Sequence, residues 1–318
     1  MTAPLFVLGV SRSGTTLLRV ILDRSPGIAI PDETFFIPQL AHRHPGTVDV
    51  ESFLDDLRRL PRLAAWEVAA DEFAARLRPG MRAGEAIGAV FSAYAAKHGK
   101  PRWGDKTPMY MRHLGLIEEL FPDAQYVHLI RDGRDAALAF LDMPSGVVTK
   151  TWAHPRSAAG FACEWRTEVR RAQALGRKVD KMRYLEVRYE GLVADTEGVI
   201  RSICDFLALP FEPAMLEYAG AVDVSEKPHH QRLLQPPTRG VRNWRDQMRP
   251  EDAAAFEHIA GDLLTELGYE LSRPGSPRRP ARALPAEAWY RLRMGGWNAA
   301  AYATQRSPLW RRRHAHLF

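Results

Sequence analysis

Residues 4–33 constrain the fold of this 318-residue chain more strongly than any other segment. A short apolar run at 5–10 leads into the loop GVSRSGTT at 9–16, after which apolar residues recur at the spacing of a helix. A strand that continues through a glycine-bounded loop into a helix presents backbone N–H groups to an anion at the helix N-terminus. The segment therefore predicts an α/β protein with an anion-binding loop.

The loop has the spacing of a P-loop, GxxxxG followed by a hydroxyl residue, with one change. Thr15 stands where a nucleotide kinase has the lysine that reaches the β- and γ-phosphates of ATP. The nearest cation is Arg12, which belongs to the loop itself. The loop thus suits an anion, and the missing lysine argues against the triphosphate end of ATP as that anion.

A carboxylate is expected beside this loop. A helix over 15–24, a turn at 26–27 and a short parallel strand over 28–30 would return the chain to the carboxyl edge of the sheet, where Asp32 and Glu33 emerge. Open α/β sheets bind their ligands at that edge. An anion-binding loop that faces a carboxylate indicates group transfer with a general base.

Lys106 is the next charged candidate. Thr107 and Pro108 form a good N-cap and N1 pair, which predicts one helix from there to about residue 120. A cation just ahead of a helix N-terminus is unfavourable on dipole grounds and usually meets an anion. A lysine on the surface is the alternative interpretation.

A second strand-to-helix junction, RDGRD at 131–135, lies between a strand expected over 125–130 and a helix expected over 136–141. Arg131 and Arg134 would lie at the carboxyl edge of the sheet, which suits a second phosphate. The same motif could instead be a salt-bridge cluster that caps the helix. Both interpretations stay open at this point.

The rest of the chain supplies supporting elements. Residues 50–99 are expected to form helices that shape an acceptor pocket, and 157–175 are expected to form an amphipathic core helix. Tyr189 ends a strand expected over 182–190 and could stack on a base or pack in the core. The segment 227–245 is rich in proline and basic residues and long enough to be a lid or binding loop.

Composition and charge limit the class of protein. With 46% hydrophobic and 26% charged residues, the chain has an ordinary globular composition. Its net charge of +6 combines +9 from ten Arg and one Glu in 273–318 with 6 − 9 = −3 from 1–272. Cys163 and Cys204 lack metal-ligand spacing and are expected in the core. The first strand starts too early for a signal peptide and no apolar run reaches membrane-spanning length, so we expect a cytoplasmic protein.

The chain resembles the sulfotransferases that use 3′-phosphoadenosine 5′-phosphosulfate (PAPS), and among them the tyrosylprotein sulfotransferases and the bacterial enzymes grouped with these. The likeness covers about residues 4–270 and rests on motifs that occur in one order at compatible spacings. They are GVSRSGTTLLRVILD with DET, DKTP, FPDAQYVHLIRDGRD, VRYEGLV with DFLALP, and NWRDQM before LGYEL. The resemblance implies a P-loop-like three-layer sandwich at 1–272, with a central, mostly parallel sheet flanked by helices and a helical insertion at about 45–100. An arginine-rich extension at 273–318 would follow it.

The resemblance also implies roles for individual residues. Glu33 would be the general base, Lys106 would lie near the leaving oxygen, and Arg12 would meet the transferring sulfuryl group. Arg131 would bind the 3′-phosphate, and Tyr189 lies in the segment that meets the adenosine. The loop that holds the 5′-phosphosulfate would consist of Ser11, Arg12, Ser13, Gly14, Thr15 and Thr16.

Ala139 departs from the family pattern, which places a serine there as a second 3′-phosphate ligand. Losing such a hydrogen bond costs about 1.5–3 kcal/mol where the phosphate is otherwise unpaired. Arg134, or Arg239 and Arg242 in the expected lid, could compensate. A catalytically inactive nucleotide-binding relative is therefore one alternative. A P-loop small-molecule kinase is another, and Thr15 argues against it.

The reaction that this resemblance implies is in-line attack of an acceptor hydroxyl on the sulfuryl group of PAPS. No metal is expected, because a sulfuryl group carries less charge than a phosphoryl group. The acceptor could be a small molecule, a lipid, a glycan or a peptide tyrosine. In 273–318, aromatic residues among arginines suit a membrane surface, nucleic acid or an acidic partner. A C-terminal helix that packs on the domain or across a homodimer is the alternative for this segment.

Overall fold

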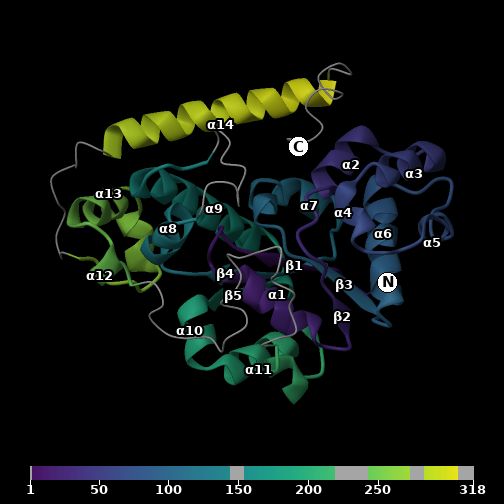
Figure 1. The fold of residues 1–318 in the computed structure, drawn as a ribbon, viewed down its shortest axis with the longest axis horizontal. Coiled ribbons are helices and arrows are strands. Elements are labelled where there is room, and N and C mark those ends of the chain that lie inside the picture. Colours follow the sequence, from purple (N-terminus) through teal and green to yellow (C-terminus); the bar gives the residue numbers. More distant parts are fainter. Residues whose placement is uncertain (1, 144–153, 219–242, 273–282, 307–318) are drawn as a thin grey trace.

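The computed structural model describes residues 2–143, 154–218, 243–272 and 283–306. Its centre is a parallel five-stranded sheet in the order β2-β3-β1-β4-β5 (Figure 1). The strands are β1 (Leu5–Leu8), β2 (Ile28–Ala29), β3 (Arg102–Asp105), β4 (Gln125–Ile130) and β5 (Tyr184–Arg188).

Helices surround this sheet (Figure 1). Those before β4 are α1 (Thr15–Asp23), α2 (Ile37–Arg43), α3 (Val50–Arg58), α4 (Pro61–Ala64), α5 (Ala70–Ala74), α6 (Ala83–Lys97) and α7 (Leu114–Leu120). Those after it are α8 (Gly133–Leu141), α9 (Ala158–Lys178), α10 (Tyr189–Ala194), α11 (Thr196–Leu207), α12 (Trp244–Gln247), α13 (Pro250–Glu266) and α14 (Ala283–Arg306). Short 3₁₀ helices are η1 (Pro108–Arg112), η2 (Lys181–Arg183) and η3 (Pro213–Leu216). None of the described helices has the length and apolar character to cross a membrane.

β1 lies at the centre of the sheet, between β3 and β4. Its first residue, Leu5, lies opposite Gly104 on one side and Gln125 on the other. Parallel neighbours must be joined by crossover segments, and helices supply these here. All of these strands therefore end at one edge, where the chain segments that follow β1, β2, β3 and β4 gather.

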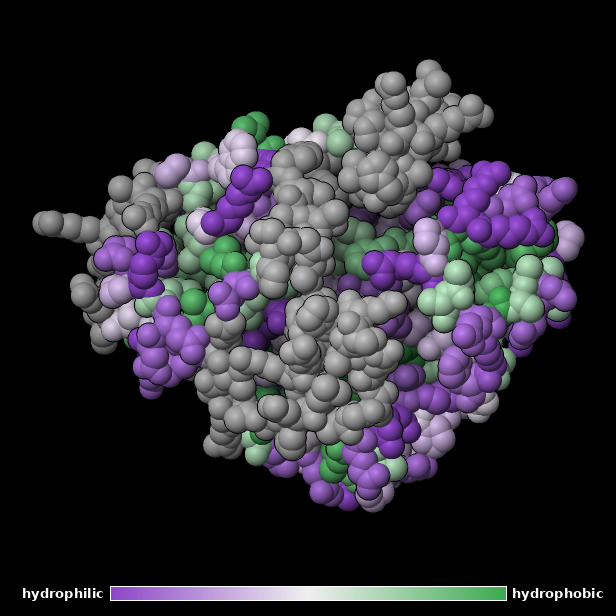
Figure 2. All heavy atoms as spheres, in the orientation of Figure 1, coloured by the Kyte–Doolittle hydropathy of each residue, from purple (hydrophilic) through white to green (hydrophobic). Residues whose placement is uncertain are grey.

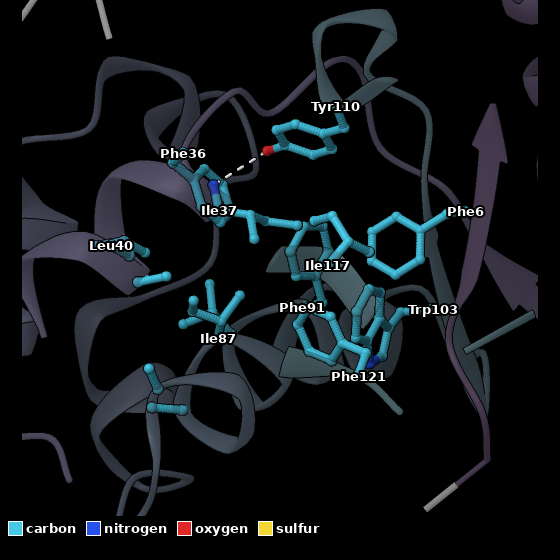
Figure 3. Packing of buried hydrophobic residues seen from close by; sticks show 14 of the residues in the cluster. Phe6, Phe36, Ile37, Leu40, Ile87, Phe91, Trp103, Tyr110, Ile117 and Phe121 are labelled. Atoms are coloured by element: carbon cyan, nitrogen blue, oxygen red, sulfur yellow. Dashed lines mark hydrogen bonds between the residues drawn. The ribbon is translucent and has the colours of Figure 1, made fainter. Parts of the chain in front are cut away.

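Side chains of β1 alternate between the two faces of the sheet. Phe6 and Leu8 belong to the core that includes α6 and α7, and Phe6 lies beside Trp103 and Phe121 in Figure 3. Leu5 and Val7 join the core formed with α1 and α11 on the other face. Helices thus cover both faces, and the three-layer α/β sandwich predicted from the sequence is confirmed.

The first segment forms as predicted, with small shifts at its ends. β1 stops at Leu8 because Val10 already belongs to the turn, where its carbonyl accepts a hydrogen bond of 3.1 Å from the N–H of Ser13. α1 and β2 then follow at 15–23 and 28–29. The returning strand pairs with β3 rather than with β1, so β3 separates the two ends of this segment in the sheet.

The single helix predicted from Pro108 to about residue 120 is wrong. The chain instead forms the 3₁₀ helix η1 and, from Leu114, the separate helix α7. The side chain of Thr107 does not cap η1. Its Oγ1 accepts a hydrogen bond of 3.0 Å from the N–H of Thr34. A tertiary contact to a distant segment has thus replaced the local capping that the sequence favours.

Residues 50–99 form helices, as predicted, and together with α2 they gather at one end of the sheet (Figure 1). Phe53, Phe73 and Phe91 of these helices are buried in the same core as Phe6. The outer surface at this end is largely hydrophilic, with hydrophobic side chains showing between the polar ones (Figure 2). The role of the helices of 50–99 in shaping an acceptor pocket stays a prediction.

The C-terminal helix α14 packs against the rest of the described chain, along α9 and α13 (Figure 1). Ala286 and Tyr290 lie against the core formed by α8, α9 and α13. Arg293 is 2% exposed, and its Nη2 lies 3.3 Å from Glu164 Oε2. The described part of this segment, 283–306, therefore forms a helix that packs on the domain, whereas the partner expected for 273–318 stays a prediction.

Candidate functional site

The loop between β1 and α1 has a shape that requires glycine at two positions. A Cβ on Gly9 would lie 2.6 Å from Thr15 Cγ2 and 2.8 Å from the carbonyl oxygen of Leu129. Gly14 has a φ of 90°, and a Cβ there would lie 2.4 Å from the ring of Tyr189. Arg12 also has a positive φ, 70°, which is costly for a residue with a side chain. The surrounding structure therefore holds this loop in a strained, defined conformation.

The loop ends in hydrogen-bond donors that α1 leaves without acceptors. The N–H groups in the first turn of an α-helix have no partner inside the helix, and Gly14 at the N-cap has no side chain to satisfy them. The hydroxyl of Ser13 is buried, and it has no hydrogen-bond partner among the described residues. Helix N-termini attract anions through both these donors and the helix dipole. Residues 11–16 are thus suited to an anionic group.

Lys106 connects this loop to a carboxylate. Its Nζ lies 3.2 Å from Thr16 Oγ1 and 2.5 Å from Glu33 Oε1. The lysine side chain is 2% exposed, whereas that of Glu33 is 31% exposed. The pair therefore combines a buried cation with a carboxylate that a molecule from solvent can reach.

The dipole argument for Lys106 changes in the structure. The long helix expected after it is replaced by η1, a 3₁₀ helix of five residues that provides little dipole to oppose a cation. The anion that Lys106 is expected to meet is nevertheless present within the same chain, as Glu33. The alternative of a surface lysine is excluded by its burial.

A buried polar network fixes the backbone next to both charged residues. Thr34 Oγ1 donates to Asp105 Oδ2 over 2.7 Å and lies 2.8 Å from Tyr110 Oη. Tyr110 Oη in turn accepts from the N–H of Ile37 over 3.1 Å, as Figure 3 shows. Thr34 follows Glu33 directly, and Asp105 directly precedes Lys106. The network therefore joins the two chain segments that carry the ion pair.

Asp105 is the ionisable member of this network. Its complete burial raises the pKa of Asp105 to about 7, against hydrogen bonds from Thr34 and Thr107 and the nearby charge of Lys106, which lower it. Reasoning from the sequence did not single out Asp105, Thr34 or Tyr110. The only available signal was that Thr34 and Asp105 fall inside the DET and DKTP motifs.

Arg131 and Tyr189 both contact the anion-binding loop. Arg131 Nη1 donates to the carbonyl oxygen of Arg12 over 3.1 Å, and the Arg131 guanidinium lies over the ring of Tyr189, 4.7 Å from its centroid. The Nε of Arg131 is buried without a hydrogen-bond partner in the described part of the chain. Tyr189 is the first residue of α10 rather than the end of a strand, and its ring lies against Gly14. The structure thus brings these two predicted site residues to the loop.

Arg134 has a different environment. Its fully buried guanidinium lies 2.7 Å from Asp132 and 2.6 Å from Glu257, and it stacks over Trp244 at 3.7 Å. Asp132 also caps α8 by accepting from the N–H of Arg134. For Arg134 the salt-bridge interpretation of the RDGRD motif is therefore correct. The expectation that Arg134 compensates for Ala139 is wrong, because its donors are already engaged.

Some of the predicted site residues are not tested. Ala139 lies buried on α8, which starts at the same junction as Arg134. Arg239 and Arg242 lie outside the described residues, so their role in compensating for Ala139 stays a prediction.

Cys163 and Cys204 are both buried, as predicted. Among the residues that the structure describes, no group of three or more His, Cys, Asp or Glu side chains is placed to hold a metal ion.

The model of the sulfotransferase family matches residues 4–213 of the chain. Among curated proteins, protein-tyrosine sulfotransferase A of Caenorhabditis elegans is 28% identical over 85% of this chain and 68% of its own length. Nodulation protein NoeE of Sinorhizobium fredii is 29% identical over 84% of this chain and 66% of its own length. The protein-tyrosine sulfotransferase of Drosophila melanogaster is 27% identical, and the chain spans 51% of its length. The chain thus spans between half and about two thirds of these relatives.

Solved structures give a consistent comparison. The sulfotransferase domain from the Synechococcus olefin synthase superposes with a TM-score of 0.60 at 26% identity, over 85% of this chain and 97% of that domain. The sulfotransferase domain from the curacin biosynthetic pathway also gives a TM-score of 0.60, at 20% identity, over 85% of this chain and 99% of that domain. At 20% identity, the second comparison supports only the fold.

Proposed function

The chain belongs to the sulfotransferase family, and from this premise we propose that it transfers the sulfuryl group of PAPS to an acceptor hydroxyl, in line, with Glu33 as the general base. The observation that carries the proposal is the position of Lys106. One buried ammonium contacts both Thr16 of the anion-binding loop and the carboxylate of Glu33. A group held by the loop and a hydroxyl held by Glu33 would therefore meet at the same cation.

The donor would bind along the loop and the two residues beside it. Ser11, Ser13 and the backbone of 11–16 would hold the 5′-phosphosulfate, which the uncapped N-terminus of α1 and the unpartnered hydroxyl of Ser13 support. Arg131 would bind the 3′-phosphate, since its Nε has no partner in the described structure. Tyr189 would contact the adenosine beside Gly14. Arg242 is proposed as a further ligand of the donor.

The acceptor proton would go to Glu33. Positioned general bases of this kind are typically carboxylates or histidines, and a side chain 31% exposed leaves room for an acceptor to approach. Lys106 would stabilise the charge that develops on the bridging oxygen, and Arg12 that on the sulfuryl oxygens. These two cations supply the neutralisation that a phosphoryl transfer obtains from Mg²⁺, so the proposed reaction uses no metal.

The acceptor is proposed only as a class. The match to protein-tyrosine sulfotransferases supports a hydroxyl acceptor, which could be a small molecule, a lipid, a glycan or a peptide tyrosine. A homodimer and a cytoplasmic location stay predictions. A catalytically inactive, nucleotide-binding relative is the competing proposal, because Ala139 removes one expected hydrogen bond to the 3′-phosphate.

Donor binding is the first test. Calorimetric titration with adenosine 3′,5′-bisphosphate should give micromolar affinity, and ADP should bind far more weakly because it lacks the 3′-phosphate. Equal affinity for the two nucleotides would contradict the proposed 3′-phosphate site and would therefore exclude PAPS as the donor. Tight bisphosphate binding without sulfation of any acceptor would favour the inactive relative.

The base is tested separately. With radiolabelled PAPS and a panel of phenols, sugars and tyrosine peptides, Glu33→Gln should lower turnover by about 10²–10⁴-fold and leave bisphosphate binding unchanged. Asp32→Asn is the matched control, because this neighbouring carboxylate is 54% exposed and pairs with Arg19 instead. Full turnover in Glu33→Gln would exclude Glu33 as the base.

A further inference from the structure

The outer face of α14 exposes apolar side chains. Among the described residues, the large hydrophobic side chains that stay exposed are those of Met182, Trp289 and Leu292, at 70%, 58% and 67%. Trp289 and Leu292 are three residues apart on α14 and so lie next to each other on one side of the helix. Met182 stands alone in η2. Scattered apolar residues are normal on a surface, but this pair belongs to a longer apolar stripe.

The stripe continues in both directions along α14. Positions three or four residues from Trp289 or Leu292 are also exposed and carry no charge; they are Pro285, Ala288, Gly295 and Gly296, and Ala299 follows three residues after Gly296. Hydrophobic side chains show at the upper edge of the molecule in Figure 2, where Figure 1 places α14. The described outer face of the helix is therefore apolar over several turns.

Contacts on the inner side of α14 fix the rotation of the helix, so that this stripe faces solvent. Tyr290 packs against the core of α8, α9 and α13. Arg293 Nη2 lies 3.3 Å from the buried carboxylate of Glu164, which Arg112 of η1 also contacts at 3.2 Å. Rotating the helix to bury Trp289 would pull Arg293 away from Glu164 and leave a buried charge with less compensation. The apolar stripe is thus a fixed part of the surface.

The sequence segment that contains α14 is strongly basic. Residues 273–318 contain ten Arg and one Glu, a net charge of +9, whereas 1–272 sum to −3. Arg291 is exposed on α14 itself, and arginines 273, 278, 279 and 282 precede the described helix in sequence while 306 and 311–313 end or follow it. An anionic surface would therefore attract the segment 273–318, which includes α14, and repel 1–272, and this difference favours an approach with α14 toward that surface.

We propose that the outer face of α14 binds an anionic lipid surface, with Trp289 and Leu292 inserted at the boundary of headgroups and acyl chains. Helices that lie in a membrane interface combine Trp and Leu on one face with nearby basic residues, and 273–318 is rich in arginine in sequence. A second copy of the chain fits less well, because pairing two stripes would bring two segments of charge +9 together. A nucleic acid would satisfy the arginines and leave the stripe uncovered.

Vesicle co-sedimentation tests this proposal with the full chain. The protein should bind vesicles of phosphatidylcholine with about one third phosphatidylglycerol at low salt, bind pure phosphatidylcholine far less, and lose affinity as salt rises. The double variant Trp289→Ser/Leu292→Ser should lower the affinity for the anionic vesicles by at least about tenfold. That change corresponds to about 1.4 kcal/mol of binding free energy.

Met182→Ser is the matched control, because it removes an equally exposed apolar side chain from a different part of the surface. It should bind vesicles as the unmodified chain does, and both variants should unfold at the same denaturant concentration as that chain. The proposal is overturned if the unmodified chain ignores anionic vesicles, or if the double variant binds them equally well. A dimer that the double variant abolishes, without vesicle binding, would assign the stripe to a second copy instead.

Discussion

Lys106 and Arg134 are both buried cations that follow strands of the same sheet, yet their surroundings differ. Lys106 pairs with Glu33, whose side chain is 31% exposed, and also reaches Thr16 of the loop. Arg134 is enclosed between Asp132 and Glu257, which are 9% and 7% exposed. The first ion pair opens to solvent on its anionic side, and the second is closed on all sides.

This difference separates a pair that is available for chemistry from one that holds the fold together. A closed pair must be complete, because removing one partner leaves an uncompensated charge in the interior. In an open pair, water can solvate the remaining partner, so the structure tolerates a change and the consequence falls on binding or catalysis. The two pairs therefore predict opposite responses to the same substitution.

Arg134→Met should produce the largest effect on stability. It leaves Asp132 and Glu257 buried without their cation, and breaking a buried pair in this way costs about 3–5 kcal/mol. Urea unfolding measures the change. Sulfuryl transfer per folded molecule should remain close to that of the unmodified chain. A stability loss below about 1 kcal/mol would show that Arg134 is not the structural cation described here.

Lys106→Met should reverse this pattern. The methionine fills most of the space of the lysine stem, and Glu33 stays accessible to water, so stability should change by less than about 1.5 kcal/mol. Turnover with PAPS should fall by about 10²–10³-fold, the size of effect seen when one group that stabilises transition-state charge is removed. Steady-state kinetics and unfolding of the same preparation test both parts. Normal turnover would place Lys106 outside the reaction.

The buried carboxyl of Asp105 gives a pH dependence that sharpens the comparison. Burial raises the pKa of Asp105 to about 7 from an ordinary value of 3.8, so the folded chain holds this proton more tightly than the unfolded chain does. Stability should therefore decrease as pH rises from about 4 to about 7, by up to about 1.4 kcal/mol per pH unit for this group. Unfolding in urea at several pH values measures the slope.

Asp105→Asn should flatten that slope without removing it. Asparagine keeps an oxygen that can accept from Thr34 but no longer titrates. Burial also raises the pKa of Glu164, whose contribution would remain. An unchanged slope in the variant would mean that Asp105 is ionised in the folded chain across this range.

Arg166→Met should have the smallest effect and serves as a reference for the open and the closed pair. Arg166 lies 2.6 Å from Asp262, but the two side chains are 46% and 52% exposed. Exposed pairs of this kind contribute little, so the change in unfolding free energy should stay within about 0.5 kcal/mol and turnover should be unaffected. A larger loss would mean that short distance, rather than enclosure, determines the strength of these pairs.

Local sequence patterns predicted the strand-loop-helix-strand segment well. Apolar runs, glycines and helix spacing act within a few residues, and α1 and β4 form close to where those patterns place them. The α/β class and the sheet follow from the same signals. The helix after Pro108 failed because Thr107 is held by Thr34, 73 positions away in sequence. A capping rule that considers neighbouring residues has no access to such a contact.

The candidate site shows the same limit. Glu33, Lys106 and Arg131 could be singled out individually, because each follows a strand at the edge where ligands bind. Other features of the site depend on contacts between distant segments. Lys106 contacts both Glu33 and Thr16, and Arg134 forms an ion pair with Glu257. The sequence suggested which residues to consider, and only tertiary packing separates the open pair from the closed one.

The contact between Gly14 and Tyr189 has a consequence for how sequences of this kind can diverge. Any side chain at position 14 would meet the ring at position 189, and the positive φ at 14 already disfavours other residues. Position 14 is therefore closed to substitution even if position 189 becomes smaller. A smaller residue at position 189 would not clash with the loop but would lose the contact between the ring and Arg131, and a bulkier one would clash with Gly14. The two sites should show unequal rates of change among descendants of this chain, with the glycine the more slowly varying of the two.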